Sequence, residues 1–323
     1  MRTRVLHMFA ACLLATTVVS AQAAERSVRI TPLGSHDGEF CRFDRALVFE
    51  DPDGTRILYD AGRTVRGADD PRLGRIDAVL LSHVHGDHLG DRHQAEANAG
   101  SCEQPEFAVS ATPESNSVNI VVGKQAEFLV GGEMASFFSK KVAAAGGDPQ
   151  QVKLVRFGAQ RSVGGVSIAS VPAVHSNGLN PAFLDKAHAE ALQANGLTAY
   201  MGPPGGYVLT FSNGLVVYLS GDTGITAEQE LVVNRFYGAS LAVINIGGTF
   251  TTGPAEAAYV MNDLVRPQSV IASHANERAT EKGKLLAGTR TETFMKAVDA
   301  PVHLPLSGVT MSFDGNGRCL AGC

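Results

Sequence analysis

The chain of 323 residues is 44% hydrophobic and 18% charged, and its formal net charge at pH 7 is -5. A chain of this size can bury a sizeable core, and its length would allow one domain or two. The negative balance, with no run of Lys and Arg longer than two, argues against a nucleic-acid substrate or partner.

The first residues have the pattern of an export signal. Arg2 and Arg4 precede a mostly apolar stretch at residues 5–20, and Ala21-Gln22-Ala23 has the small residues of a cleavage site. We therefore expect a signal peptide over residues 1–23, and a single mature domain over residues 24–323 that is periplasmic or secreted. No later apolar run approaches the ~20 residues of a membrane span, so none is expected in the mature chain.

The mature chain would retain four cysteines, which are Cys41, Cys102, Cys319 and Cys323. An even number in an exported protein favours disulfides, and four cysteines allow three pairings. We favour Cys41 with Cys102, because each follows a loop that can reach one rim of a shared site. Cys319 with Cys323 would close a tight loop near the C-terminus, and free thiols are the alternative.

Apolar runs and turn signals predict strands through much of the chain. The turns Asp51-Pro52-Asp53-Gly54 and Asn213-Gly214 each indicate a hairpin, and Gly164-Gly165 indicates a turn between two further strands. The expected strands, in chain order, cover residues 27–33, 46–50, 56–60, 78–82, 152–157, 163–174, 207–212, 215–220, 241–246 and 269–273.

Helical patterns occur between these strands. The expected helices cover residues 112–122, 134–145, 254–264 and 289–298, with a short helix and loop in the polar, Ala-rich residues 91–102. Because strands and helices occur in two runs, the pattern favours an α/β fold with four layers, the αββα sandwich.

Residues 177–206 form a long insertion that contains a helix-like run at residues 183–195 and then several Gly and Pro residues. A long insertion beside a site is often a lid or a substrate wall. The apolar lining of such a lid would be Phe183, Leu184, Leu197, Tyr200 and Met201. A solvated surface helix on a loop is the alternative.

The most informative stretch is residues 82–91, which follow the expected strand at 78–82. His83 and His85 are two residues apart, so they can point to the same side. Asp87 and His88 follow a glycine that lets the chain turn toward a second point nearby. Imidazole and carboxylate suit zinc and similar divalent metals, so two such points predict two metal ions.

Three later polar residues each follow an expected strand, and they could complete the two metal sites. They are His175, Asp222 and His274. A catalytic zinc usually has about three protein ligands and an open position for water. Since the loop supplies two residues for each metal, convergence of these strand ends on one edge of the sandwich would complete both sites.

This pattern resembles the metallo-β-lactamase superfamily, whose metal loop has the form H-x-H-x-D-H. The likeness runs from about Val28 to about Phe313, and within it the chain is most similar to metal-dependent hydrolases related to ascorbate-6-phosphate lactonase, on residues 83–91, 218–224 and 246–258. The resemblance implies one metal held by His83, His85 and His175, a second held by Asp87, His88 and His274, and Asp222 bridging the two.

A metal pair of this kind lowers the pKa of a bound water to about 7 and provides a hydroxide nucleophile. The expected reaction is hydrolysis of an ester, lactone, amide or phosphodiester in a small-molecule substrate, with Asp87 or Asp222 passing a proton to the leaving group. Zinc is the default ion, and manganese or iron suits the same residues. A β-lactam-hydrolysing enzyme and a non-catalytic metal- or ligand-binding protein that retains the fold are the alternatives.

Four residues are weaker candidates for the site. His36 follows the first expected strand and could contact substrate, although a surface position is favoured. Thr249, Phe250 and Thr252 follow another strand and could border the site. For Thr252 the alternative is a helix-capping role ahead of Pro254.

Overall fold

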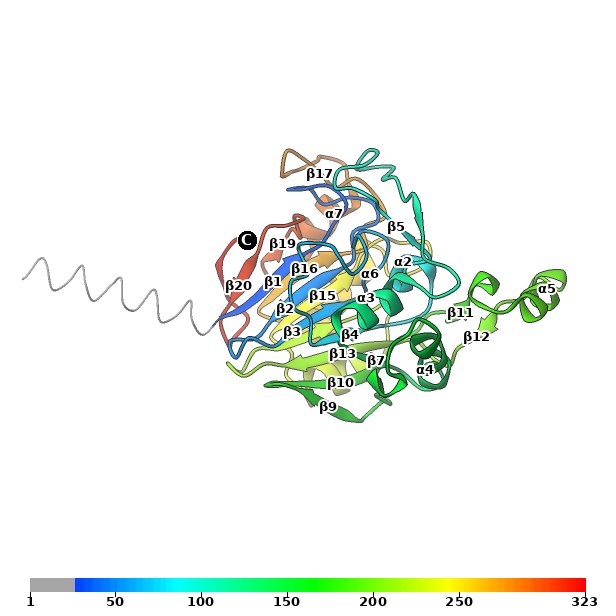
Figure 1. Cartoon of the computed structure of the whole chain (residues 1–323). Helices are drawn as coiled ribbons and strands as arrows, with labels where there is room; N and C mark the ends of the chain where they lie inside the picture. The colour runs from blue at the N-terminus through cyan, green and yellow to red at the C-terminus, as the bar shows by residue number, and fades with distance from the viewer. Residues whose placement is uncertain (1–26) are drawn as a thin grey trace, which may run out of the picture.

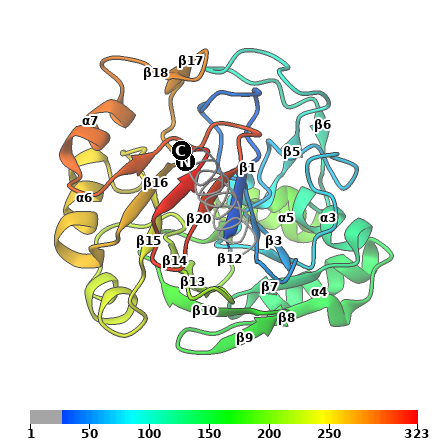
Figure 2. The ribbon, with the colours of Figure 1, turned by 90° about the vertical axis from the view of Figure 1, so that its left-hand side faces the viewer.

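The computed structural model describes residues 27–323, so the predicted signal peptide lies outside the described residues. Two sheets pack face to face, and helices cover the outer face of each sheet (Figure 1). In Figure 2, α6 (Pro254–Tyr259) and α7 (Arg290–Ala297) lie on the left, and α3 (Asn116–Lys124) and α4 (Met134–Ala144) lie on the right, with the strands between them. The predicted αββα sandwich is confirmed.

The first sheet has eight strands, in the order β21-β20-β1-β2-β3-β4-β7-β8. Its strands are β1 (Val28–Pro32), β2 (Leu47–Glu50), β3 (Arg56–Tyr59), β4 (Ala78–Leu80), β7 (Glu127–Val130), β8 (Val152–Leu154), β20 (Met311–Phe313) and β21 (Cys319–Ala321). The stretch from β3 to β8 is parallel. All three residues of β4 are fully buried, as expected for a parallel strand covered on both faces.

The second sheet has seven strands, in the order β19-β16-β15-β14-β13-β10-β9. Its strands are β9 (Gln160–Val163), β10 (Val166–Pro172), β13 (Gly205–Thr210), β14 (Val216–Leu219), β15 (Leu241–Asn245), β16 (Ser269–Ser273) and β19 (Val302–His303). Both β10 and β14 are antiparallel to β13, and β14, β15 and β16 are mutually parallel. The strands β10, β14 and β16 therefore all end at the same edge of the sheet.

Three apolar clusters hold the four layers together. The central cluster lies between the sheets, where Phe49 of β2 stacks with Phe211 just after β13 at 6.0 Å between ring centroids. A second cluster packs the α3 and α4 side against the first sheet, and Phe138 meets Phe128 at 5.0 Å there. The third joins the second sheet to α6, α7 and two π-helical segments, η3 (Gln229–Asn234) and η4 (Val260–Val265).

Several strand and turn predictions are confirmed, and others need correction. The Asn213-Gly214 turn joins β13 to β14 as predicted. Gly164-Gly165 joins β9 to β10, whereas the expected partner strand at residues 152–157 contributes β8 to the other sheet. The short helix expected within residues 91–102 is absent from that described segment, because Asn98 and Gly100 have positive φ angles that interrupt a helix. In the two large sheets, strands β7, β9, β19, β20 and β21 were not predicted.

Both favoured disulfides, Cys41–Cys102 and Cys319–Cys323, are formed. The remaining short strands are β5 (Arg92–His93), β6 (Val109–Ser110), β17 (Thr280–Glu281) and β18 (Lys284–Leu285). Among the residues that the structure describes, no helix has the length and apolar character needed to cross a bilayer.

The insertion at residues 177–206 forms an arm that extends away from the body of the molecule (Figure 1). It contains β11 (Gly178–Leu179), the short 3-10 helix η2 (Pro181–Phe183), α5 (Lys186–Ala194) and β12 (Ala199–Tyr200). The predicted lining is largely wrong, because Phe183 and Met201 are buried in the apolar cluster of the α3 and α4 side and Leu197 is 57% exposed. Tyr200 alone among the five borders a cavity next to the ligand cluster described below.

Candidate metal centre

The loop after β4 places three imidazoles and a carboxylate at the edge of the first sheet. The chain passes from Leu80 through the fully buried His83 to α2 (Gly86–Leu89), a single helical turn that carries Asp87 and His88. The glycine at position 86 leaves room for Asp91, because a Cβ there would lie 2.8 Å from the Asp91 carboxyl carbon and displace that side chain.

The other three predicted residues come from the second sheet. His175 and Asp222 each lie three residues beyond the ends of β10 and β14, and His274 directly follows β16. His274 has a φ of 49°, a left-handed conformation that is unfavourable for a residue with a Cβ. Residues held in such conformations often belong to functional sites, because the surrounding structure must stabilise them.

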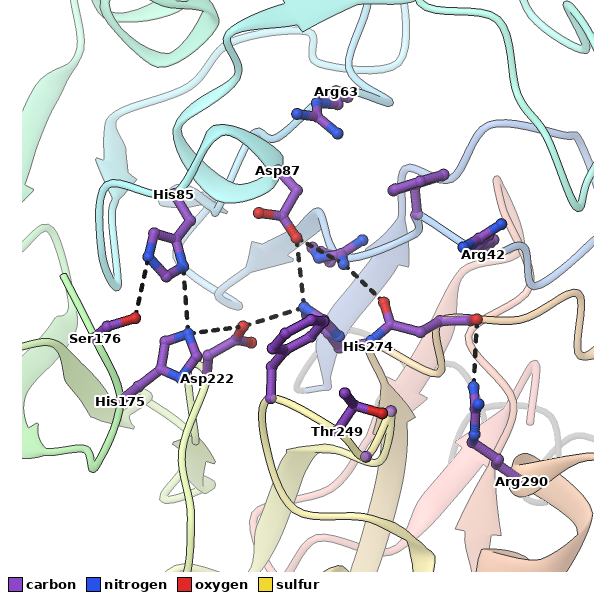
Figure 3. Close-up of a pocket in the computed structure, with 16 residues that line it drawn as sticks. Arg42, Arg63, His85, Asp87, His175, Ser176, Asp222, Thr249, His274 and Arg290 are labelled. Carbon is purple, nitrogen blue, oxygen red and sulfur yellow. Dashed lines mark hydrogen bonds and ion pairs between the residues drawn. The ribbon is translucent and has the colours of Figure 1, made fainter. Parts of the chain in front are cut away.

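The structure brings all seven predicted side chains into one cluster. Figure 3 shows those that face the cavity above it, which are His85, Asp87, His175, Asp222 and His274. One group contains His83, His85 and His175, whose ligand atoms lie within 4.8 Å of one another. In this group His85 Nδ1 lies 3.0 Å from His83 Nε2 and 3.2 Å from His175 Nε2. This group could hold one metal ion.

A second group contains Asp87, His88 and His274. The Asp87 carboxylate lies 3.9 Å from His88 Nε2 and 3.5 Å from His274 Nε2. The oxygens of Asp222 face both groups: Oδ1 is 3.3 Å from His88 Nε2, and Oδ2 is 3.2 Å from His274 Nε2 and 3.7 Å from His175 Nε2. The arrangement could therefore hold two metal ions on either side of Asp222.

Unsatisfied polar atoms test whether these side chains fit a metal. His88 Nε2, His274 Nε2 and Asp222 Oδ1 are buried and have no hydrogen-bond partner among the described residues. Buried polar atoms without partners are costly and rare in folded proteins. Imidazole nitrogens and carboxylate oxygens that point at one another in this way match the donor set of zinc and similar cations.

Asp60, which directly follows β3, orients one ligand candidate, His88, through its far ring nitrogen. Its carboxylate lies 2.7 Å from His88 Nδ1 and accepts hydrogen bonds from the backbone N–H and the hydroxyl of Ser82, at 2.9 and 2.7 Å. A carboxylate on the far nitrogen of an imidazole fixes the ring and its tautomer for metal binding. Sequence reasoning assigned no role to Asp60, and its only signal was its place at the end of an expected strand.

The two carboxylates of the cluster are ionised despite burial. Burial raises the pKa of Asp222, but the imidazoles of His274 and His88 outweigh this effect and hold the pKa well below its usual range. Burial likewise raises the pKa of Asp87, and the Arg45 guanidinium and His88 outweigh it. Both side chains are thus in the form that binds a cation.

The imidazoles divide into two classes. Burial lowers the pKa of His83, His85 and His175, so these rings are neutral and can donate a lone pair to a metal. Burial also lowers the pKa of His88, but three carboxylates, Asp222 first among them, outweigh it and raise the pKa to about 10. His88 therefore keeps a proton that a metal ion would replace.

A cavity of about 650 Å³ opens over the cluster, a size suited to a small molecule. Its walls include four arginines, which are Arg42, Arg45, Arg63 and Arg290. Arg42 and Arg290 lie across the cluster from His85 and Ser176 (Figure 3). Sequence reasoning did not identify any of these arginines, because each is isolated in the chain.

Of the four weaker candidates, two line the cavity and two do not. Thr249 and Phe250 line the cavity, and Phe250 is 75% exposed. Thr252 is buried, and its hydroxyl donates to the Asn245 carbonyl at 2.8 Å rather than capping α6, so the capping alternative is wrong. His36 does not line this cavity, and its ring contacts Ser35 and the Gly100 carbonyl.

Comparison with solved structures supports the fold. The chain is similar to Igni18, a metallo hydrolase from Ignicoccus hospitalis, with a TM-score of 0.58 and 21% identity over 89% of this chain and 99% of the other. It is also similar to the metallo-beta-lactamase fold protein YhfI from Bacillus subtilis, with a TM-score of 0.54 and 13% identity over 89% of this chain and 99% of the other.

Sequence comparison identifies the family. UPF0173 metal-dependent hydrolases from Cupriavidus necator and Myxococcus xanthus are each 30% identical to this chain, over 69% and 71% of it and 68% and 67% of the relatives. The relative from Cupriavidus metallidurans is 31% identical over 62% of this chain, and the match spans only 58% of that protein. Residues 55–275 match the family model described as Beta-lactamase superfamily domain. The chain therefore belongs to the beta-lactamase superfamily.

Proposed function

We propose that this protein is an exported metal-dependent hydrolase that holds two divalent cations, of which zinc is the first choice. The observation that carries the proposal is the position of Asp222, whose carboxylate lies beside imidazoles of both groups: 3.3 Å from His88 and 3.2 Å from His274 in one, and 3.7 Å from His175 in the other. The names of the UPF0173 relatives support a metal-dependent hydrolase. The closer likeness to ascorbate-6-phosphate lactonase-related hydrolases stays a prediction.

The chain's own residues would divide the work between binding and proton transfer. One cation would be held by His83, His85 and His175, the other by Asp87, His88 and His274, with Asp222 between them. When bound, such a pair provides Lewis acidity and lowers the pKa of a water molecule to about 7. Asp87 is the more accessible carboxylate, with 24% of its side chain exposed against 6% for Asp222, so Asp87 is the better placed to pass a proton to a leaving group.

Export is supported by the two disulfides. Cys41–Cys102 and Cys319–Cys323 account for all the cysteines among the described residues. Disulfides persist in the periplasm and outside the cell but are rare in the reducing cytosol. Together with the signal-like N-terminal sequence, they favour a periplasmic or secreted protein.

A hydrolysis panel tests the function. Purified mature protein, loaded with zinc or manganese, is assayed on lactones, aryl esters, amides, phosphodiesters and the β-lactam nitrocefin, with its metal content measured by mass spectrometry. We expect turnover of one class, lost on chelation and restored by metal. The variant Asp222→Ala should lose roughly 10³-fold or more of the activity, while Asp299→Ala, an exposed carboxylate away from the cavity, should keep it.

Each alternative has its own outcome. Nitrocefin as the preferred substrate would identify a β-lactam-hydrolysing enzyme. Two bound metals without turnover of any compound would favour a binding protein that retains the fold. Turnover that survives both chelation and Asp222→Ala would refute the proposal.

A further inference from the structure

Two cavities that differ in charge meet at the ligand cluster. The first, of about 650 Å³, holds the four arginines, and the second, of about 690 Å³, opens on the side of the arm. Both are bordered by His85, His175 and Ser176, so the two cavities adjoin at these side chains. A molecule bound over the cluster can therefore extend into both.

The first cavity carries positive charge that the protein neutralises only in part. Arg63 is fully paired with Asp91 through two hydrogen bonds, at 2.6 and 2.9 Å. Arg290, in contrast, has no carboxylate within 4.0 Å among the described residues, and its Nη1 contacts only two backbone carbonyls at 3.4 Å. Arg42 has a single partner, Glu103, at 3.4 Å and half exposed to solvent, where an ion pair contributes little.

Arg45 adds a buried charge beside Arg42 and Arg290, and these three arginines form the part of the first cavity that we call the wall. Its side chain is only 3% exposed, and its Nη2 is shared between Asp87 at 2.7 Å and the Asn276 side chain at 3.1 Å. The Nε and Nη1 atoms are enclosed and have no partner among the described residues. Apart from the ligand candidates Asp87 and Asp222, no acidic side chain lines this cavity. A negatively charged group held here would compensate the excess charge.

The second cavity differs from the first in having no Asp, Glu, Lys or Arg side chain, and it combines polar side chains such as Asn177 and Thr198 with exposed apolar ones. Its walls include Val174, Tyr200 and Pro204. Val174 and Tyr200 are 61% and 73% exposed, so their apolar surface is available to a ligand. An alkyl or aryl group would be removed from water by contact with these side chains.

We propose that the substrate is an amphiphilic small molecule with an anionic group on one side of its scissile bond and an apolar group on the other. The anion, a carboxylate or a phosphate, binds Arg42 and Arg290 in the field of Arg45, and the apolar group lies against Val174 and Tyr200. The scissile bond then lies over the ligand cluster, a placement that rests on the proposed function. Arg42, Arg45 and Arg290 lie outside the residues matched to the family model, 55–275.

Calorimetric titration of the zinc-loaded protein tests this inference without requiring turnover. N-octanoylglycine carries both features, N-acetylglycine carries only the anion, and octanamide carries only the apolar chain. We expect N-octanoylglycine to bind at least roughly ten-fold more tightly than either partial compound, because charge-assisted hydrogen bonds and apolar burial each contribute. Equal binding of all three compounds would overturn the inference, and so would binding by the anion alone, which marks simple coordination to zinc.

Variants assign each half of the ligand to its cavity. The double variant Arg42→Gln/Arg290→Gln should reduce the affinity for N-octanoylglycine to that for octanamide. Tyr200→Ser should reduce it toward that for N-acetylglycine. The matched controls Arg318→Gln and Tyr259→Ser change an exposed arginine and a part-exposed tyrosine that line neither cavity, and should have no effect. If a cavity variant binds like its control, the inference fails.

The two proposals can fail separately. Tight and selective binding of N-octanoylglycine by a protein without hydrolytic turnover would refute the hydrolase but keep the amphiphilic ligand. Efficient hydrolysis of neutral, short esters with no preference for the amphiphile would do the reverse.

Discussion

The ligand cluster and the arginine-bearing wall above it lie next to each other but are built in different ways. The seven ligand candidates follow the ends of buried strands or lie on one turn of helix, so the paired sheets determine their positions. Arg42 and Arg45 lie instead in the irregular segment between β1 and β2, which has no ladder hydrogen bonds of its own. The sheets thus fix the ligand candidates, and loops place the arginines beside them.

This difference predicts that different interactions hold the two regions in place. The Cys41–Cys102 disulfide and the hydrogen bonds of the buried Asp44 hold the wall in place. The sheets and the contact of Asp60 with His88 hold the cluster in place. A substitution that removes an interaction holding the wall should alter ligand recognition and leave metal binding unchanged. A substitution that removes an interaction holding the cluster should do the opposite.

Removal of the Cys41–Cys102 disulfide should have the largest effect on stability. It joins residues 61 apart and sits directly beside the wall, since the Arg42 N–H donates to the Cys102 carbonyl at 3.2 Å. By loop entropy it contributes about 4 kcal/mol, against about 2 kcal/mol for Cys319–Cys323, which spans 4 residues. Urea unfolding of Cys41→Ser/Cys102→Ser and Cys319→Ser/Cys323→Ser would measure both.

The same two double variants distinguish effects on ligand binding by the wall from effects on zinc binding by the cluster. Cys41→Ser/Cys102→Ser should weaken binding of N-octanoylglycine while zinc content stays at the wild-type level. Cys319→Ser/Cys323→Ser should change neither. Equal losses of stability in the two variants, or loss of zinc from the first, would contradict a wall that is held independently of the cluster.

Asp44 should make the stability of the wall depend on pH. Its buried carboxylate accepts hydrogen bonds from the backbone N–H groups of Ser35 and Cys41, at 2.9 and 2.8 Å. Burial raises its pKa from 3.8 to about 6. The folded state therefore binds this proton more tightly than the unfolded state, so the contribution is complete below about pH 4 and is lost as the pH rises through about 6. The full change is on the order of 3 kcal/mol.

Denaturation of the wild type and Asp44→Asn between pH 4 and pH 8 would reveal this contribution. The wild type should lose stability relative to the variant as the pH rises from 4 to 6, and the difference should then level off. Asp37→Asn, on the exposed part of the same loop, should follow the wild type throughout. Parallel curves for the wild type and Asp44→Asn would rule out Asp44 as the titrating group.

The contrast between cluster and wall also explains what could be predicted from the sequence. A buried apolar run that ends in His or Asp is a local signal, and strand ends on one edge converge, so the gathering of His83, Asp222 and His274 was predictable. Arg45 and Asp60 acquire their positions through contacts with residues far away in the chain, such as Asp87 and His88. No local pattern distinguishes such residues from ordinary surface or turn residues.

The incorrect predictions have the same origin. The helix expected within residues 91–102 rested on composition, whereas Asn98 and Gly100 adopt positive φ angles in a loop that the disulfide at Cys102 holds to the wall. The apolar residues of the arm were assigned to a lid lining, but Phe183 and Met201 fill the core beneath its base. Apolar character predicts burial, yet it does not say against which surface.

The smallest expected effect is that of Asp60→Asn, which removes the carboxylate that contacts His88. An amide is a weaker acceptor than a carboxylate for the His88 imidazole, so the ring loses orientation and basicity. We expect roughly 10- to 100-fold weaker zinc affinity, as is usual when the partner of a ligand imidazole is changed. Competition with a chromophoric chelator would measure it.

Asp51→Asn provides the matched control for Asp60→Asn. Asp51 follows β2 as Asp60 follows β3, is equally buried, and accepts two hydrogen bonds from Ser212, at 2.7 and 2.6 Å, with no contact to the cluster. Its loss should lower stability and leave zinc affinity unchanged. If both variants lost zinc alike, the ligand geometry would depend on the stability of the sandwich as a whole. If only Asp60→Asn loses zinc, the single carboxylate that contacts His88 Nδ1 tunes the metal affinity, independently of the stability of the sandwich.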